Sequence, residues 1–151
     1  MKVGFPGEGR WDRMLGDLHP MTLSSIASIG LALGRAGDPA AAEPYCRQAM
    51  EGYRRVLSDD HPDTLISMST LGAVLADLRR FAEAEPLAVK AANGALRALG
   101  RDDRRTVELV RVVIMLYANR HKAQRRKGYD AKAAQWRAKL PEVECANEQD
   151  E

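Results

Sequence analysis

The sequence has few aromatic residues, only two cysteines and no long apolar stretch. Aromatic side chains make up 5% of the 151 positions while alanine is abundant, which favours closely packed helices over a β-sandwich. Cys46 and Cys145 lie far apart and form no CxxC pair, so neither a zinc site nor a disulfide framework is indicated. The longest apolar run, residues 112–118, is too short to cross a membrane.

Motifs of the common enzyme classes are also missing. We find no GxSxG, GxxxxGK[ST] or HExxH pattern and no Cys/His pair with catalytic spacing, so we expect no enzyme activity, no cofactor and no metal. Glu43 and Glu85 recur at one spacing, which we interpret as surface solvation, and His19 and His61 each precede a proline, which indicates a turn. The two isolated cysteines favour a reducing, cytoplasmic setting, and the first residues contain no signal-peptide stretch, so we expect a soluble protein that is not exported.

A repeat of 42 residues is the main feature that the sequence does contain. The segment LGDLHPMTL at 15–23 returns as LSDDHPDTL at 57–65, and residues 15–56 agree with residues 57–98 at 16 of 42 positions. A third copy is weaker but keeps the interval, with Thr22, Thr64 and Thr106 in step, and Asp103 stands near the lost His-Pro as a helix cap. The repeat predicts three units, near 15–56, 57–98 and 99–140.

Each repeat unit is predicted to be a pair of antiparallel helices. Pro20 and Pro62 suit a first helical turn, and apolar residues then recur at helical spacing. Gly30 and Gly72 are expected to meet small residues, Ala42 and Ala84, of the second helix. Unit three holds seven additional residues, close to two helical turns. We therefore expect an all-α solenoid with helices near 20–36, 39–56, 62–79, 82–98, 104–126 and 130–140.

These residues resemble the tetratricopeptide repeat, and the 42-residue period with Leu-Gly-Asp-x-His-Pro-x-Thr and Ala-Glu-Pro resembles its kinesin-light-chain subtype. The resemblance covers residues 10–140 and implies a non-catalytic scaffold that binds a protein or peptide on the concave face made by the first helices. Other members of the family often have a pair of asparagines in the first helix that holds a peptide backbone. This chain lacks the pair, because the corresponding positions are Ala27-Ser28, Ser69-Thr70 and Arg111-Val112.

The resemblance places the concave face on one set of positions in each unit, and spacings of three and four residues independently put each set on one helical face. Most of these side chains are small or apolar, which predicts a shallow groove for an apolar or helical ligand. The alternative is a surface covered by the protein's own neighbouring units. The predicted residues are Ser24, Ala27, Leu31, Gly34 and Arg35, then Ile66, Ser69, Ala73, Ala76 and Asp77, then Glu108, Arg111, Met115, Ala118 and Asn119.

Positive charge gathers in the third unit and suggests a second function. Residues 101–140 contain 12 Lys or Arg and 4 Asp or Glu, whereas residues 141–151 contain no Lys or Arg and 5 Asp or Glu. A basic helix over 120–127 predicts a nucleic-acid-associated regulator. Its candidate phosphate contacts are Arg120, Lys122, Arg125, Arg126 and Lys127. No aromatic residue interleaves the run, so we rank a solvated helix end above this function.

The two ends of the repeat domain are predicted to differ. Residues 1–9 are rich in Gly and Pro and are expected to be irregular, and residues 141–151 are expected to form an acidic, disordered tail. Residues 10–15 align with 52–57 and so correspond only to the end of a second helix. The first unit would then have an exposed apolar edge. We expect a longer array or a homodimer through this unit, with Trp11, Met14 and Ile29 near the contact.

Overall fold

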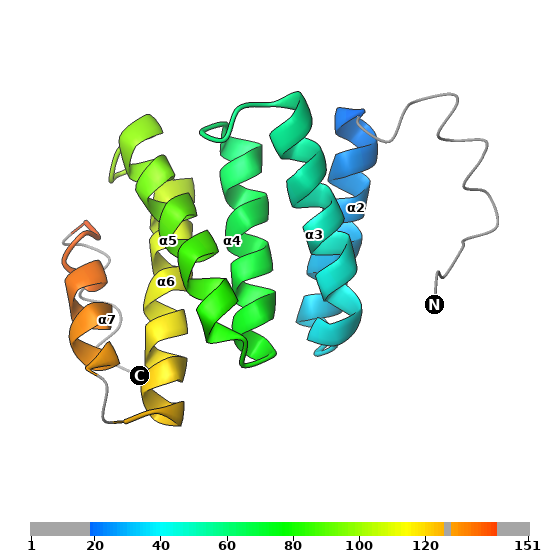
Figure 1. Ribbon diagram of the computed structural model, residues 1–151. Coiled ribbons are helices and arrows are strands. Elements are labelled where there is room, and N and C mark those ends of the chain that lie inside the picture. The colour runs from blue at the N-terminus through cyan, green and yellow to red at the C-terminus, as the bar shows by residue number, and fades with distance from the viewer. Residues whose placement is uncertain (1–18, 126–127, 142–151) are drawn as a thin grey trace.

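The computed structural model describes residues 19–125 and 128–141, which contain helices and no strand. The predicted all-α fold is therefore confirmed, while the expected irregular segment, partial helix at 10–15 and acidic tail lie outside the described residues. Figure 1 shows the helices as a row of pairs that runs from α2 at one end to α7 at the other. They are α2 (Pro20–Arg35), α3 (Pro39–Val56), α4 (Pro62–Asp77), α5 (Phe81–Ala98), α6 (Arg104–Ala123) and α7 (Tyr129–Arg137).

Each first helix of a pair begins at a side chain that caps it. His19 and His61 precede a proline at the start of α2 and α4, and each Nδ1 accepts the backbone N–H two residues on at 3.2 Å. Asp103 does the same for α6, where its carboxylate accepts the N–H of Arg105 at 2.9 Å. A free backbone donor in the first turn is thus satisfied in all three units, which explains why the third unit can lose its histidine.

Small residues let the two helices of a pair approach closely. A Cβ on Gly72 would lie 3.3 Å from the carbonyl oxygen of Ala84 and 3.2 Å from the Cβ of Ala88, so the predicted contact with Ala84 is present. Gly30 differs from the prediction, because the nearest atom to its Cβ position would be Sγ of Cys46 at 2.6 Å rather than a group on Ala42. Cys46 lies one helical turn beyond Ala42, at the position of Ala88 in the next unit.

The apolar core is not divided evenly among the units. One large cluster extends from Ala42 and Cys46 of α3 through α4, α5 and α6 to Trp136 and Leu140. A separate small cluster, made of Leu23, Ala49 and Tyr53, lies between α2 and α3. The first unit therefore shares less of the common core than the other two, as expected for an array in which each unit is completed by its neighbours.

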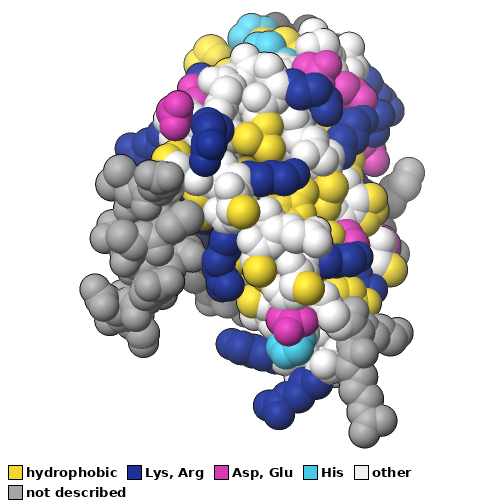
Figure 2. All heavy atoms as spheres, turned by 90° about the vertical axis from the view of Figure 1, so that its left-hand side faces the viewer, with side chains coloured by type: hydrophobic (Ala, Val, Ile, Leu, Met, Phe, Trp, Pro, Cys, Tyr) yellow, Lys and Arg dark blue, Asp and Glu magenta, His cyan; other side chains and the backbone are white. Residues whose placement is uncertain are grey.

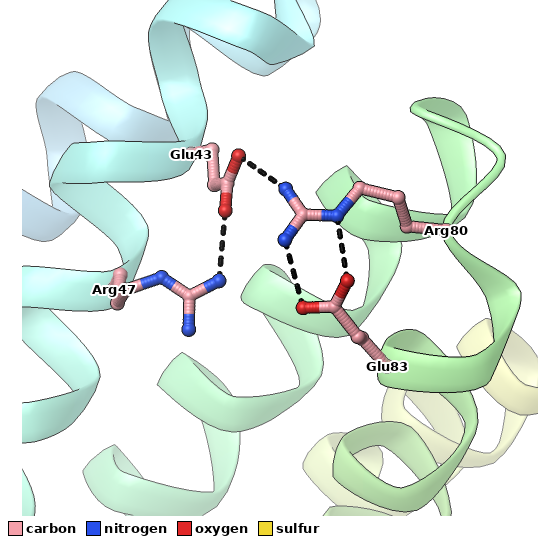
Figure 3. Close-up of polar contacts among 4 residues, drawn as sticks. All are labelled: Glu43, Arg47, Arg80 and Glu83. Carbon is pink, nitrogen blue, oxygen red and sulfur yellow. Dashed lines mark hydrogen bonds and ion pairs between the residues drawn. The ribbon is translucent and has the colours of Figure 1, made fainter.

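A carboxylate at one repeat position ties each unit to the next. Glu43 of α3 accepts hydrogen bonds from Arg47 and, across the unit boundary, from Arg80, each at 2.7 Å. Arg80 also binds Glu83, so four side chains form one chain of ion pairs (Figure 3). The Arg47 bond lowers the pKa of Glu43; burial opposes this, and Arg80 lowers it further.

Glu85, one repeat later, makes the corresponding connection from α5 to the third unit. It accepts from the Tyr117 hydroxyl at 2.8 Å, from Arg120 and from Lys132 at 3.3 Å. Burial raises the pKa of Glu85, but the Tyr117 bond and the two cations outweigh burial and keep it below its usual value. Glu43 and Glu85 are therefore partly buried connectors between units, and the interpretation as surface solvation is wrong for both.

The seven additional residues of unit three are divided between a helix and a loop. α6 ends at Ala123 and not at residue 126, and α7 spans Tyr129–Arg137 and not 130–140. Gly128 caps α7 with a φ of 66°, a left-handed conformation that glycine adopts without steric cost. Gln124 and Arg125, which the periodicity assigns to the helix, lie beyond the end of α6.

Candidate binding cleft

A cleft of about 150 Å³ opens between α2 and α4, the first helices of units one and two. The two helices form its walls and α3 forms its floor. α2 contributes Ser24, Ala27, Ser28 and Leu31, α4 contributes Asp63, Ile66, Ser67 and Thr70, and α3 contributes Cys46, Ala49 and Tyr53.

The cleft continues along the two helices into a second hollow of about 190 Å³. Leu31 and Thr70 line both hollows, so they form one groove that is parallel to α2 and α4. The second hollow is lined by Gly30, Leu31, Gly34, Arg35, Thr70, Ala73, Val74 and Asp77. From Ser24 to Arg35 the groove follows twelve residues of helix, a rise of about 16 Å at 1.5 Å per residue.

The groove offers an apolar surface with charge only at its ends. The hydroxyls of Ser28 and Thr70 donate to backbone carbonyls of their own helices at 2.8 and 2.9 Å, so their protons are already used. Asp63 lies at one end of the groove, and Arg35 and Asp77 lie at the other. This distribution suits an apolar side chain in the middle of a ligand and polar groups beside it.

Two titratable groups on the floor of the cleft have raised pKa values because they are partly shielded from water. Burial raises the pKa of the Tyr53 hydroxyl, and the nearby charge of Asp63 adds to the effect. Burial also raises the pKa of the Cys46 thiol, which is free. Both groups therefore remain neutral near pH 7 and contribute apolar surface to the cleft.

One residue that lines the cleft is much smaller than its counterpart in the next unit. Ser67 lines it from α4, and its hydroxyl donates to the carbonyl of Thr64 at 2.8 Å. The corresponding residue of unit three, 42 positions later, is Leu109, which is buried in the large core cluster. A leucine therefore occupies the space between α4 and α6 that a serine leaves open between α2 and α4.

Comparison with protein families agrees with this architecture. The sequence profile described as tetratricopeptide repeat matches residues 21–97, just over half of the chain and the segment that holds both walls of the cleft. The chain belongs to the tetratricopeptide repeat family. A comparison with curated protein sequences gave no match. The tetratricopeptide match ends before α6, so the third unit is identified as a repeat by its register and its packing alone.

Most predicted concave residues of the first two tetratricopeptide units lie along this groove. The residues that line it as predicted are Ser24, Ala27, Leu31, Gly34, Arg35, Ile66, Ala73 and Asp77. Ala76 and Ser69 are both 3% exposed and do not line it. Ser69 sits at the position of Ala27 one unit later, where the side chain is buried. It is therefore inaccessible to a partner in this conformation.

The predicted residues of unit three are not part of the groove. Glu108 and Met115 are exposed on α6, whereas Arg111, Ala118 and Asn119 are half-buried. The prediction also missed wall residues, Ser28, Asp63, Ser67 and Thr70, and the whole floor. The floor belongs to α3, a second helix, and so lies outside the face of the first helices that the spacing of three and four residues defines. The substitution of leucine for serine between units two and three was the available signal.

The predicted basic helix over 120–127 is not present as such. α6 ends at Ala123, and Arg120 is held by Glu85 with its guanidinium 4.4 Å from the ring centroid of Tyr129. Lys122 and Arg125 are exposed, while Arg126 and Lys127 lie outside the described residues. Figure 2, which faces the α7 end, shows Lys and Arg side chains scattered around apolar ones rather than joined in one basic surface.

Two further findings limit the chemistry of the described part of the chain. Among residues 19–125 and 128–141, no cluster of three or more His, Cys, Asp or Glu side chains is arranged to hold a metal ion. Within the same ranges, no helix combines the length and the hydropathy that a membrane crossing requires.

Proposed function

We propose that this chain is a non-catalytic scaffold that binds a protein or peptide partner in the groove between α2 and α4. The observation that carries the proposal is the open apolar cleft beside Ser67, at a place that Leu109 fills one unit later. The 42-residue spacing supports assignment to the kinesin-light-chain-like subtype, and the free thiol of Cys46 supports a cytoplasmic location.

The size of the cleft favours one aliphatic anchor on the partner. A volume of about 150 Å³ accommodates a side chain such as leucine or methionine, which would lie against Ala27, Leu31 and Ile66. Burial of such a side chain contributes about 1.5–3 kcal/mol. The rest of the affinity must come from contacts along the second hollow and from polar groups near Asp63 and Asp77.

Partner binding is tested with a peptide library displayed on phage and selected against the full chain. Selected peptides should contain a recurrent aliphatic residue, and their affinity is measured by fluorescence anisotropy. Leu31→Glu should weaken binding at least tenfold, because it puts a charge on the apolar wall. The matched control is Ile29→Glu, two residues away and similarly exposed on another face of α2, which should bind normally.

Ser67→Leu provides a second test because it copies the closed junction of unit three. The leucine should fill the cleft, leave the helical circular dichroism unchanged and abolish peptide binding. If peptides selected on the parent bind Ser67→Leu and Leu31→Glu as tightly as the parent, the groove is not the binding site.

The nucleic-acid alternative now rests on fewer residues. Lys122 and Arg125 remain exposed, but Arg120 is committed to Glu85 and to the ring of Tyr129. We expect no gel shift with RNA or DNA at 50 mM salt. A complex that weakens steeply with salt and is lost in Lys122→Glu would favour this function instead.

A further inference from the structure

The outer face of α2, turned away from unit two, carries an apolar stripe with nothing described over it. The stripe has spacings of four, four, three and four residues, so its members lie on one side of the helix. All five are exposed, including Met21 at 72% and Ile29 at 46%. The stripe consists of Met21, Ser25, Ile29, Ala32 and Ala36.

The corresponding faces of the next two units are buried. Ile29 corresponds to Leu71 and Val113, which are both 0% exposed. Likewise Ala32 corresponds to Val74 and Leu116, which are buried. Ser25 corresponds to Ser67 and Leu109, which are buried as well. In α4 and α6 this face is therefore the one by which a first helix packs on the unit before it.

The cover in those units is a repeat-type helix. α3 packs on α4 and α5 packs on α6, and Cys46 and Met50 of α3 share a core cluster with Leu71 and Val74. The residues 42 positions before Cys46 and Met50 are Gly4 and Glu8, which bring no apolar side chain. At these two positions the segment in that register thus lacks the side chains that cover Leu71 in unit two, while Trp11 and Met14 correspond to Tyr53 and Val56 at the end of α3 only.

We propose that a second copy of this chain covers the stripe, with the two α2 helices packed antiparallel around a two-fold axis near Ile29. In that arrangement Ser25 faces Ala32 of the other copy and Met21 faces Ala36, so large side chains meet small ones. No stripe residue is charged, and the Ser25 hydroxyl already donates to the Met21 carbonyl at 2.9 Å, so the face can be buried without an unsatisfied donor.

A two-fold contact fits this face better than head-to-tail stacking. Stacking would bring the α7 end of one copy onto α2 of the next, and Figure 2 shows that this end carries many Lys and Arg side chains. The stripe has no acidic residue to meet them, and α2 has none in its first turn. Closed two-fold pairing is also the commonest symmetry of soluble homo-oligomers.

Sedimentation velocity of the full chain between 1 and 100 µM tests the pairing. We expect a concentration-dependent dimer, and Ile29→Glu should raise its dissociation constant at least tenfold. Leu31→Glu, the mutation designed to disable the groove, should leave the dimer intact, so failure of the groove and failure of the dimer are distinguishable. Circular dichroism of both variants checks that they remain folded.

Cysteine cross-linking tests the orientation in a Cys46→Ala, Cys145→Ser background. Ile29→Cys should form a disulfide with itself, and a mixture of Ser25→Cys and Ala32→Cys chains should cross-link to each other. Three results would overturn the proposal: a monomer at 100 µM, a dimer that Ile29→Glu does not weaken, or oligomers that grow beyond two copies. A monomer whose α2 amides exchange slowly would further show that residues 1–18 cover the stripe.

Discussion

The junction between α2 and α4 and the junction between α4 and α6 are built from the same repeat, yet different side chains fill them, and the cleft described above opens at the first. Leu109 fills the second junction, whereas Ser67 leaves the first one open. Ala76 is buried at the second junction, and Gly34 lines the groove at the first. The comparison teaches that the repeat determines the path of the helices, while single small residues determine where a partner can enter.

The largest effect is expected when the closed junction is opened. Leu109→Ala should lower the free energy of unfolding by about 2–5 kcal/mol, because it removes a buried leucine and leaves a cavity. Leu31→Ala, on the wall of the junction between α2 and α4, should lower the free energy of unfolding by less than about 1 kcal/mol, because that leucine is only partly buried. Urea denaturation measures both, and equal losses would contradict the contrast between the junctions.

Gly72→Ala should be the next most destabilising change, at about 1–3 kcal/mol. Its Cβ would lie 3.3 Å from the carbonyl oxygen of Ala84 and from the backbone nitrogen of Ala88, and backbone atoms cannot move aside cheaply. Thermal unfolding measures the effect. A melting temperature at or above that of the parent would show that α4 and α5 do not approach as closely as described.

Glu85→Gln should cost about 1 kcal/mol at neutral pH, because the charge that Arg120 and Lys132 contact is lost. The pKa of Glu85 lies below its usual value in the folded protein. Its contribution is therefore fully present above the unfolded pKa and is lost as the pH falls through the folded one.

The melting temperature of the parent should consequently fall more steeply than that of Glu85→Gln when the pH is lowered from about 5 to about 3. Parallel pH profiles for the two proteins would mean that the carboxylate does not connect unit two to unit three. Glu83→Gln, at an exposed carboxylate bound by Arg80, is the control.

The smallest expected effect is a gain. Gly34→Ala gives the junction between α2 and α4 the residue that the junction between α4 and α6 already has at this repeat position, Ala76. The added Cβ would lie 3.7 Å from Val74 and 4.0 Å from Ala42, which are ordinary contacts, so alanine should stabilise the helix by about 0.5–1 kcal/mol. A loss of stability would indicate that the groove is narrower here than described.

The helices were predictable because their signals are local and repeated. The His-Pro pairs at 19–20 and 61–62 mark helix starts, and a fixed interval places each apolar stripe. The end of α6 was not predictable from periodicity, since seven additional residues fit two helical turns as well as they fit a loop. Gly128, which adopts a left-handed conformation, was the local sign of the break.

The cleft was only half predictable for a different reason. Helical spacing identifies which residues share a face, so Ala27, Leu31 and Ile66 were found. Whether that face is open depends on side chains of the next unit, and the burial of Ser69 follows from packing between units rather than from its own position. The connecting roles of Glu43 and Glu85 likewise depend on cations 35 to 47 residues away along the chain.

Isoleucine methyl NMR tests the central claim most directly, because the chain has four isoleucines and three report separately on the groove, the outer face and the core. Addition of a selected peptide should shift the Ile66 methyl signal and leave Ile114, buried on α6, unchanged. Dilution of the protein without peptide should shift Ile29 and not Ile66. A bound peptide that leaves Ile66 unshifted would contradict binding in the groove between α2 and α4.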